Sequence, residues 1–215
     1  FGGEMKKISF QKLLFLFTRS QQFPAFDFVP YKQGCFSFQS YADMRTMMKY
    51  EQVREEKEKW IKADKESYLE QLKLKDKEVL GEIYKTYGKS SGNDLISLTY
   101  KSYPFYALKS TIAHKFLSKE ELAEVKKTVL PNTRTILYTI GYEGVSLESY
   151  LNKLIINDIK VLCDVRKNPL SMKYGFSKSQ LNNACESLGI SYVHVPDLGI
   201  DSDNTAESGY TKGLR

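Results

Sequence analysis

The chain has 215 residues, of which 41% are hydrophobic and 27% are charged. This is the composition of a folded globular protein, and it excludes the disordered and fibrous classes. The longest apolar runs, 13–17 and 136–140, are far shorter than the roughly 20 residues of a membrane-spanning helix. We therefore expect no membrane segment. Because the sequence starts at Phe1 and not at a methionine, it leaves open whether the natural chain extends before Phe1 or beyond Arg215.

Cysteine and histidine are both scarce. Cys35, Cys163 and Cys185 lie far apart and form no Cys-x-x-Cys pair, which argues against a disulfide framework and against a structural zinc site. We therefore expect a reducing, cytoplasmic location. With only His114 and His194, the chain cannot build a centre of several histidines, so we predict no metal site, and the sequence indicates no particular cofactor.

The positive charge is unevenly distributed along the chain. Of 32 Lys and Arg and 26 Asp and Glu, residues 1–133 hold 23 and 17, which leaves nine of each sign for residues 134–215. A basic half beside a neutral half suggests one part that contacts a polyanion, such as nucleic acid, and one part with another task. A solvated, lysine-rich surface without a partner is the alternative.

The first 130 residues predict mainly helices. Apolar spacing and capping residues indicate a helix over 6–17, an extended segment over 26–31, a helix over 38–49 capped by Ser37, a charged and solvated helical region over 49–78, a helix over 80–87, and a helix over 119–128 opened by Ser118. The segment 100–107 interleaves lysine and tyrosine. Its rings can form a stacking platform for nucleic-acid bases or pack in the helical core.

A hinge is predicted at 131–134, and a different pattern follows it. Strands are expected over 136–140, 159–165 and 191–195, with helices beginning after Ser146 and Ser177. Apolar strands that alternate with helices indicate parallel pairing, so we predict a Rossmann-like parallel α/β domain over 135–215 after a mainly helical domain over 1–130. Alternation along the second strand places Cys163 on the face opposite Asp164, as a buried and unreactive thiol.

Ligands of parallel sheets bind at the carboxyl ends of the strands, so the residues there are the candidate site. Glu143, between two glycines, can act as a general base or hold a sugar hydroxyl; the alternative is a turn residue. Asp164 and Arg166, two apart on an extended segment, can act in catalysis, bind an anion together or form a structural ion pair. The remaining candidate ligand-binding residues are Gly141, Tyr142, Gly144, Asn168, Ser171 and Asp197. We expect His194 to be structural.

Four segments resemble successive motifs of a bacterial family catalogued as domain of unknown function 488. They are 139–144, 164–169, 175–177 and 192–199. The resemblance implies a Rossmann-like domain whose biochemical activity is unsettled. The later half of that family normally carries a further strand and helix, a Cys-x-Glu motif and a Cys-His-Arg motif, and these motifs are absent from this sequence. The α/β domain is therefore expected to lack its C-terminal half.

The first region is similar to the pattern of the Panacea-type antitoxin domain, a helical domain associated with toxin–antitoxin and phage-defence loci. The segments 11–15, 31–37 and 103–107 carry the similarity, although Gly34-Cys35 stands where that pattern has Gly-Pro. The resemblance implies that residues 1–130 form a recognition or regulatory module for nucleic acid or a protein partner.

Two functions remain open from the sequence. In the first, the helical module recognises nucleic acid or a partner while the α/β module acts on a nucleotide or nucleic acid, in a bacterial protein of phage defence. In the second, the protein is a non-enzymatic, antitoxin-like regulator whose α/β half senses a small ligand. The sequence does not decide whether the protein is an enzyme.

Overall fold

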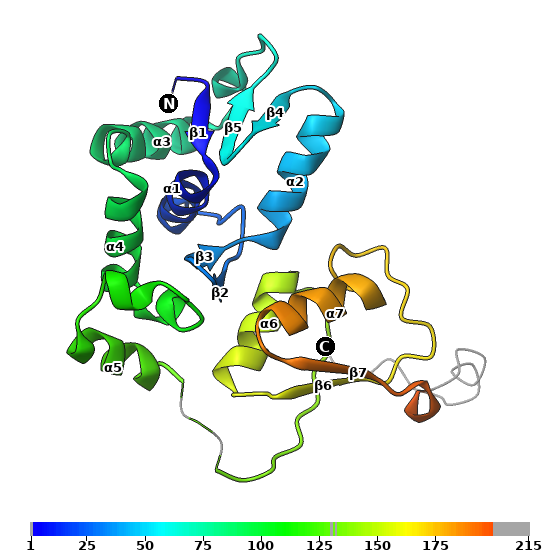
Figure 1. The fold of residues 1–215 in the computed structure, drawn as a ribbon. Helices are drawn as coiled ribbons and strands as arrows, with labels where there is room; N and C mark the ends of the chain where they lie inside the picture. Colours follow the sequence, from blue (N-terminus) through cyan, green and yellow to red (C-terminus); the bar gives the residue numbers. More distant parts are fainter. Residues whose placement is uncertain (1, 130, 132, 200–215) are drawn as a thin grey trace. The chain divides into compact units, whose positions relative to one another are not determined.

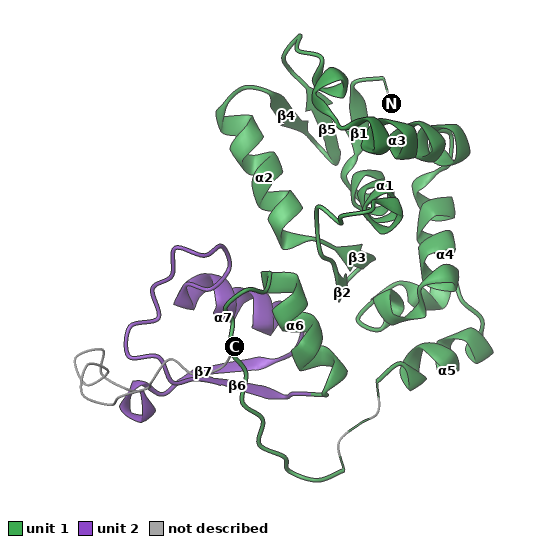
Figure 2. Cartoon of the chain, turned by 180° about the vertical axis from the view of Figure 1, so that it is seen from behind, with its two compact units in different colours: residues 1–158 green, residues 159–215 purple. Residues whose placement is uncertain are grey.

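The chain divides into two compact units. The computed structural model describes residues 2–129, 131 and 133–199, and its contacts separate residues 1–158 (unit 1) from residues 159–215 (unit 2), as Figure 2 shows in two colours. The division falls between Asp158 and Ile159, C-terminal to the predicted hinge at 131–134. The fold is mixed α/β with small sheets, which confirms the predicted class at that level. A Rossmann-like arrangement remains a prediction.

Unit 1 combines helices with two small antiparallel sheets (Figure 1). Its elements in chain order are β1 (Glu4–Lys6), α1 (Lys7–Ser20), β2 (Val29–Tyr31), β3 (Gly34–Phe36), α2 (Phe38–Lys49), β4 (Val53–Glu56), β5 (Lys59–Lys62), η1 (Tyr68–Gln71), α3 (Leu74–Tyr87), α4 (Gly92–Ser102), η2 (Pro104–Ala107), η3 (Ala113–Lys115), α5 (Lys119–Lys127) and α6 (Leu147–Ile156). The strands pair in the orders β1-β5-β4 and β2-β3. The predicted caps are confirmed, because Ser37 accepts from the backbone of Ser40 and Ser118 forms a capping box with Glu121.

Helix α1 lies at the centre of unit 1, packed against α3, α4 and β3. Phe15 is fully buried and makes edge contacts with three rings, at centroid distances of 5.2 Å to Phe28, 5.0 Å to Tyr103 and 4.7 Å to Tyr106. Edge-to-face geometry brings the positive ring edge against the negative ring face, which adds to the burial of apolar area. An aromatic cluster around this helix therefore forms one part of the core of unit 1.

The aromatic segment 100–107 belongs to this core. Tyr100 is fully buried in α4, and Tyr103 and Tyr106 contact Phe15. Burial raises the pKa of both Tyr100 and Tyr106 to about 12. The predicted packing of these rings in the core is confirmed for Tyr100, Tyr103 and Tyr106, and a stacking platform for nucleic-acid bases stays a prediction.

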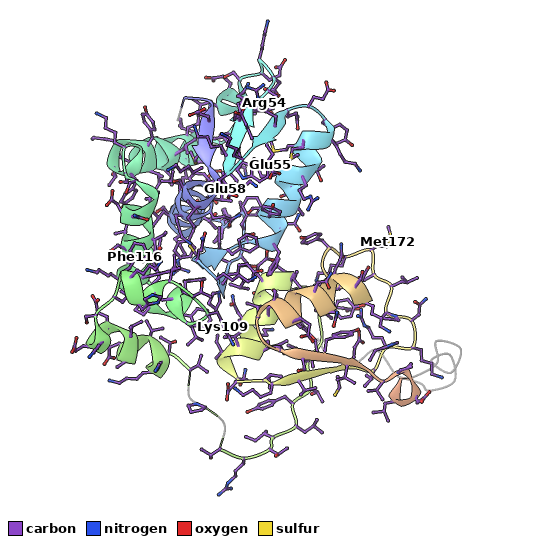
Figure 3. All side chains as sticks on the ribbon, in the orientation of Figure 1. Arg54, Glu55, Glu58, Lys109, Phe116 and Met172 are labelled. Atoms are coloured by element: carbon purple, nitrogen blue, oxygen red, sulfur yellow. The ribbon has the colours of Figure 1, made fainter. Side chains whose placement is uncertain are left out.

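The charged region 49–78 is where the predicted helix is wrong. Strands β4 and β5 form a hairpin there, with Trp60 and Val53 buried and charged side chains outside; Glu55 and Glu58 are labelled in Figure 3. Burial of Val53 and Trp60 in two paired strands outweighs the helical propensity of Glu and Lys, and Lys57, at φ 53°, makes the turn between the strands. The ion pair from Lys59 to Glu4 on β1, at 2.8 Å, adds a cross-strand contact.

The predicted strand over 136–140 is also absent. Residues 133–146 form no helix or strand, and Leu137 is 93% exposed. A β-branched sequence favours a strand only where a neighbouring strand accepts its backbone hydrogen bonds, and the described residues pair no strand with this segment. Of the predicted hinge, Pro131, Thr133 and Arg134 lie within the described residues and Asn132 lies outside them.

Helix α6 begins at the predicted cap Ser146 and is joined to the rest of unit 1 by polar contacts. Glu148 is 1% exposed, and one of its carboxylate oxygens accepts from the Gln39 backbone N–H at 2.8 Å and from the Ser37 hydroxyl at 3.1 Å, at the N-terminus of α2. The Asn152 amide donates to the carbonyl of Phe28 at 2.7 Å. A carboxylate at a helix N-terminus satisfies free N–H groups and complements the helix dipole, so Glu148 acts as a second cap of α2.

Unit 2 contains β6 (Val161–Asp164), α7 (Lys178–Ser187), β7 (Ser191–His194) and η4 (Pro196–Leu198). The two strands pair in parallel, as predicted, and α7 packs against β7. Leu162 and Asp164 occupy the buried face of β6, whereas Cys163 is exposed. The prediction that Cys163 is buried was therefore wrong: alternation placed it correctly opposite Asp164, but that face of the strand is open.

No helix in the described part of the chain is both long and apolar enough to cross a membrane. Within the same residues, no three His, Cys, Asp or Glu side chains gather in a way that could hold a metal ion.

Candidate functional site

The candidate site lies where the two strands of unit 2 end. Asp164 is the last residue of β6, His194 is the last residue of β7, and the two are partners in the parallel register. The loop 165–177 leads from β6 to Ser177, which precedes the first turn of α7. Strand pairing therefore brings the carboxyl ends of β6 and β7 side by side.

Asp164 accepts hydrogen bonds from two side chains. The Arg166 guanidinium donates to both carboxylate oxygens, from Nε at 2.8 Å and from Nη2 at 2.5 Å, and the Arg166 backbone N–H donates at 3.1 Å. The Tyr192 hydroxyl donates at 2.6 Å. Burial alone would raise the pKa of Asp164, but these hydrogen bonds outweigh it and hold the pKa at about 2. A carboxylate this acidic is a weak general base.

Arg166 is held on two sides. Besides its two contacts with Asp164, its guanidinium donates from Nη1 to the carbonyl of Phe176 at 2.9 Å. The planar guanidinium thus connects the end of β6 to the far end of the loop, just before α7. The sequence placed Asp164 and Arg166 on one face of an extended segment, and the structure brings them together as an ion pair.

Tyr192 is a member of this cluster that the sequence analysis did not single out. Burial and its hydrogen bond to the Asp164 carboxylate raise the pKa of the Tyr192 hydroxyl, so this group stays protonated and donates. The available signal was alternation in β7, which places Tyr192 on the same face as His194.

The orientation of His194 follows from its two neighbours. Its Nε2 lies 2.8 Å from the carbonyl oxygen of Arg166, and a carbonyl only accepts, so Nε2 carries a hydrogen and donates. Its Nδ1 lies 3.0 Å from the Lys178 ammonium, which only donates, so Nδ1 is the acceptor. In this arrangement, the His194 ring orients Lys178, the first residue of α7. Lys178 is a second residue that the sequence analysis did not single out, although the predicted cap at Ser177 placed it in the first helical turn.

The polar residues of the loop mainly shape the loop itself. The side-chain oxygen of Asn168 accepts from the backbone of Leu170, and the hydroxyl of Ser171 accepts from the backbone of Lys173. The Ser177 hydroxyl donates to the carbonyl of Ser171 at 3.0 Å. Asp197 is exposed in η4.

The candidates of the first predicted strand end belong to unit 1. Glu143, Gly141 and Gly144 are exposed and Tyr142 is half-buried, in the turn that precedes the cap of α6. Gly144 has φ +69°, a conformation that L residues rarely adopt, so a tight turn explains this glycine. The structure thus assigns Glu143 and Asp164 to different units.

Comparison with known proteins gives a match in the last part of the chain. Residues 146–212 match the family model described as "Domain of unknown function DUF488". No curated protein and no solved structure matches the chain. The similarity of residues 1–130 to Panacea-type domains therefore stays a prediction, whereas the predicted resemblance of the C-terminal region to the DUF488 family is confirmed for residues 146–212.

Proposed function

We propose that unit 2 binds the phosphate group of a nucleotide or of a nucleic-acid strand at Lys178 and the N-terminus of α7. The observation that carries this proposal is the Lys178–His194 pair. The imidazole of His194, at the end of β7, lies 3.0 Å from the amine of Lys178 and orients this exposed side chain in the first turn of α7. Helix N-termini present backbone N–H groups and partial positive charge, which favours an anion.

The first turn of helix α7 carries a lysine and no acidic residue, as does the first turn of α1. The Ser177 side chain makes no capping hydrogen bond, because its hydroxyl is used by Ser171, and the first turn contains no acidic residue. A lysine at this position adds positive charge to an end that is already positive, which costs stability unless an anion offsets it. The α7 N-terminus is therefore positively charged and has no side-chain cap, which suits the binding of an anion.

The surrounding sequence supports the same ligand. The basic segment, residues 165–185, contains Arg166, Lys167, Lys173 and Lys178 and no acidic residue, although residues 134–215 as a whole hold equal numbers of both signs. A local excess of positive charge attracts phosphates. This local charge supports an anion contact in unit 2, in addition to any contact made by the basic first 133 residues.

Binding without turnover is the version that the geometry of Asp164 favours. The carboxylate is occupied by Arg166 and Tyr192 and has a pKa of about 2, so it is poorly suited to accept a proton from a substrate. Asp164 and Arg166 then act as positioning residues that hold the loop and, through the carbonyl of Arg166, His194. Catalysis by Glu143, Asp164 and Arg166, a part in phage defence, and a cytoplasmic location all remain predictions.

The experiment is a titration of the full chain with two probes, ATP and a short, fluorescently labelled single-stranded DNA. Both carry phosphates, and they distinguish the sources: a nucleotide site binds ATP, whereas a strand-binding site binds DNA with a steep salt dependence. We expect Lys178→Ala to weaken binding of the preferred probe by about tenfold.

Lys160→Ala is the matched control, since Lys160 precedes β6 at the other end of the strand and the variant removes the same charge. It should change binding by less than about twofold. Absence of binding to both probes, or equal losses in the two variants, would refute the proposal.

A further inference from the structure

Unit 1 contains a buried amine beside a buried thiol. Lys12 of α1 and Cys35 of β3 are each 1% exposed. The Lys12 Nζ lies 3.1 Å from the Cys35 carbonyl oxygen and 3.5 Å from the Cys35 Sγ. A lysine this deeply buried is rare unless its charge is paired, so the pair requires an explanation.

The partners available to Lys12 fit a neutral amine. Among the residues that the structure describes, the Lys12 side chain has hydrogen-bond partners only on Cys35, and neither is a carboxylate. Burial lowers the pKa of Lys12 and raises the pKa of Cys35. An uncharged amine keeps a nucleophilic lone pair, here on a nitrogen that is close to sulfur.

The packing around the pair keeps the two groups together. A Cβ atom added to Gly34, at φ +95°, would lie 3.0 Å from the Lys12 Nζ and 2.5 Å from an edge carbon of Tyr100. Gly34 is therefore required for the β2–β3 turn to approach Lys12, and the buried ring of Tyr100 closes the space on the other side. Within such packing, the amine is held 3.5 Å from the sulfur.

We propose that Lys12 and Cys35 form an oxidant-dependent cross-link, a sulfenamide between Nζ and Sγ. In the first step, hydrogen peroxide oxidises the thiol to a sulfenic acid and is reduced to water: Cys–SH and H₂O₂ give Cys–SOH and H₂O. In the second step, the Lys12 lone pair attacks sulfur, the S–O bond breaks, and the amine proton leaves with the hydroxyl as water. The product is Cys–S–NH–Lys, with two hydrogens fewer than the reduced pair.

Burial affects the two steps in opposite ways. It slows the first step, because peroxide reaches Cys35 only when unit 1 opens locally. It favours the second step, because the sulfenic acid is then shielded from further peroxide and from other thiols while the amine is held at a high effective concentration. The cross-link would join α1 to the β2–β3 hairpin at the centre of unit 1. Because burial slows the oxidation of Cys35, the amount of cross-link would increase slowly with exposure to the oxidant.

The test is peptide mapping of the full chain after treatment with hydrogen peroxide, under non-reducing conditions. We expect the peptides that contain Lys12 and Cys35 to appear as one linked species whose mass is lower by two hydrogens than their sum, and to separate again after treatment with a thiol. An unlinked Lys12 peptide, with Cys35 either free or oxidised to the sulfinic acid, would overturn the proposal.

A second measurement uses dimedone, which traps sulfenic acids. In a Lys12→Met variant, the sulfenic acid of Cys35 has lost its amine partner, so dimedone labelling at Cys35 should be about tenfold higher than in the natural chain. Cys163, which is exposed, serves as the internal control and should be labelled equally in both proteins. Equal labelling of Cys35 in the two proteins would overturn the proposal, and the linked peptide of the natural chain tests it even if the variant fails to fold.

Discussion

The ion pair at the end of β6 makes a prediction about the stability of unit 2 that depends on pH. Asp164 has a pKa of about 2 in the folded chain, compared with about 3.9 in an unfolded one. Since the folded pKa is lowered, the carboxylate contributes stability that is complete well above pH 4 and is lost as the pH falls through 2. At 1.4 kcal/mol per pKa unit, the contribution is about 2.6 kcal/mol at pH 7 and about 1.3 kcal/mol at pH 3.

The perturbation is Asp164→Asn, which keeps the shape and one acceptor but removes the charge that Arg166 and Tyr192 hold. Amide hydrogen exchange of β6 and β7 measures the local free energy of opening. We expect the variant to exchange about 80-fold faster at pH 7, which corresponds to about 2.6 kcal/mol, and about tenfold faster at pH 3.

Asp197→Asn is the matched control, because Asp197 lies in the same unit but is exposed in η4. Its effect should stay within about 0.5 kcal/mol at both pH values. Trp60, the single tryptophan of the chain, is buried in unit 1 and reports whether the variant disturbs that unit. A difference between the natural chain and Asp164→Asn that is the same at pH 7 and pH 3 would refute the electrostatic reasoning.

Two further predictions concern unit 1 and use Trp60 fluorescence during urea unfolding. Glu148→Ala should cost about 1–3 kcal/mol at pH 7, because the Gln39 N–H and the Ser37 hydroxyl lose their acceptor. Glu148→Gln should cost less than about 1 kcal/mol. Burial raises the pKa of Glu148, so ionisation of the carboxyl in the folded chain lowers the stability as the pH rises through that pKa. The glutamine amide does not ionise and therefore does not have this loss. Equal losses in both variants at pH 7 would contradict this account. Phe15→Ala should cost about 3–5 kcal/mol, because it opens a cavity among three rings, whereas truncation of the exposed Phe23, 76% accessible, should leave the urea midpoint nearly unchanged.

The sequence predicted correctly those parts of the fold that depend on residues close to one another in the sequence. The caps at Ser37, Ser118 and Ser146 mark real helix starts, because a cap acts within three residues of itself. The parallel pairing of strands 161–164 and 191–194 was also predicted, because apolar strands that alternate with helices favour parallel pairing. These features need no knowledge of distant parts of the chain.

The errors arose where distant residues decide the structure. The β4–β5 hairpin is made of residues with helical propensity, and it forms because β1, about 55 residues earlier, pairs with β5 and because Trp60 is buried. The segment 136–140 has a strand-like sequence and no strand partner among the described residues. In both cases propensity was outweighed by the presence or absence of a neighbouring strand.

The candidate site shows the same limit at the level of single side chains. Spacing predicted the contact between Asp164 and Arg166, which are two residues apart. It did not predict Tyr192, which reaches Asp164 across the sheet, or Lys178, which reaches His194 from the start of α7. These partners depend on the parallel register of β6 and β7, and a register is fixed only when the strands pair.

Helix α6 shows why the match to a family model and the structural division do not coincide. The matched region begins at residue 146, the cap of α6, yet α6 belongs to unit 1, where it packs against β2 and α2. Glu148 caps α2 through groups more than 100 residues away in the chain. Leaving those groups without an acceptor costs free energy, so the first helix of the matched region is also a structural part of the first unit. A change in the matched region that displaced α6 would therefore act on the N-terminus of α2 directly, through a helix that the two parts of the sequence share.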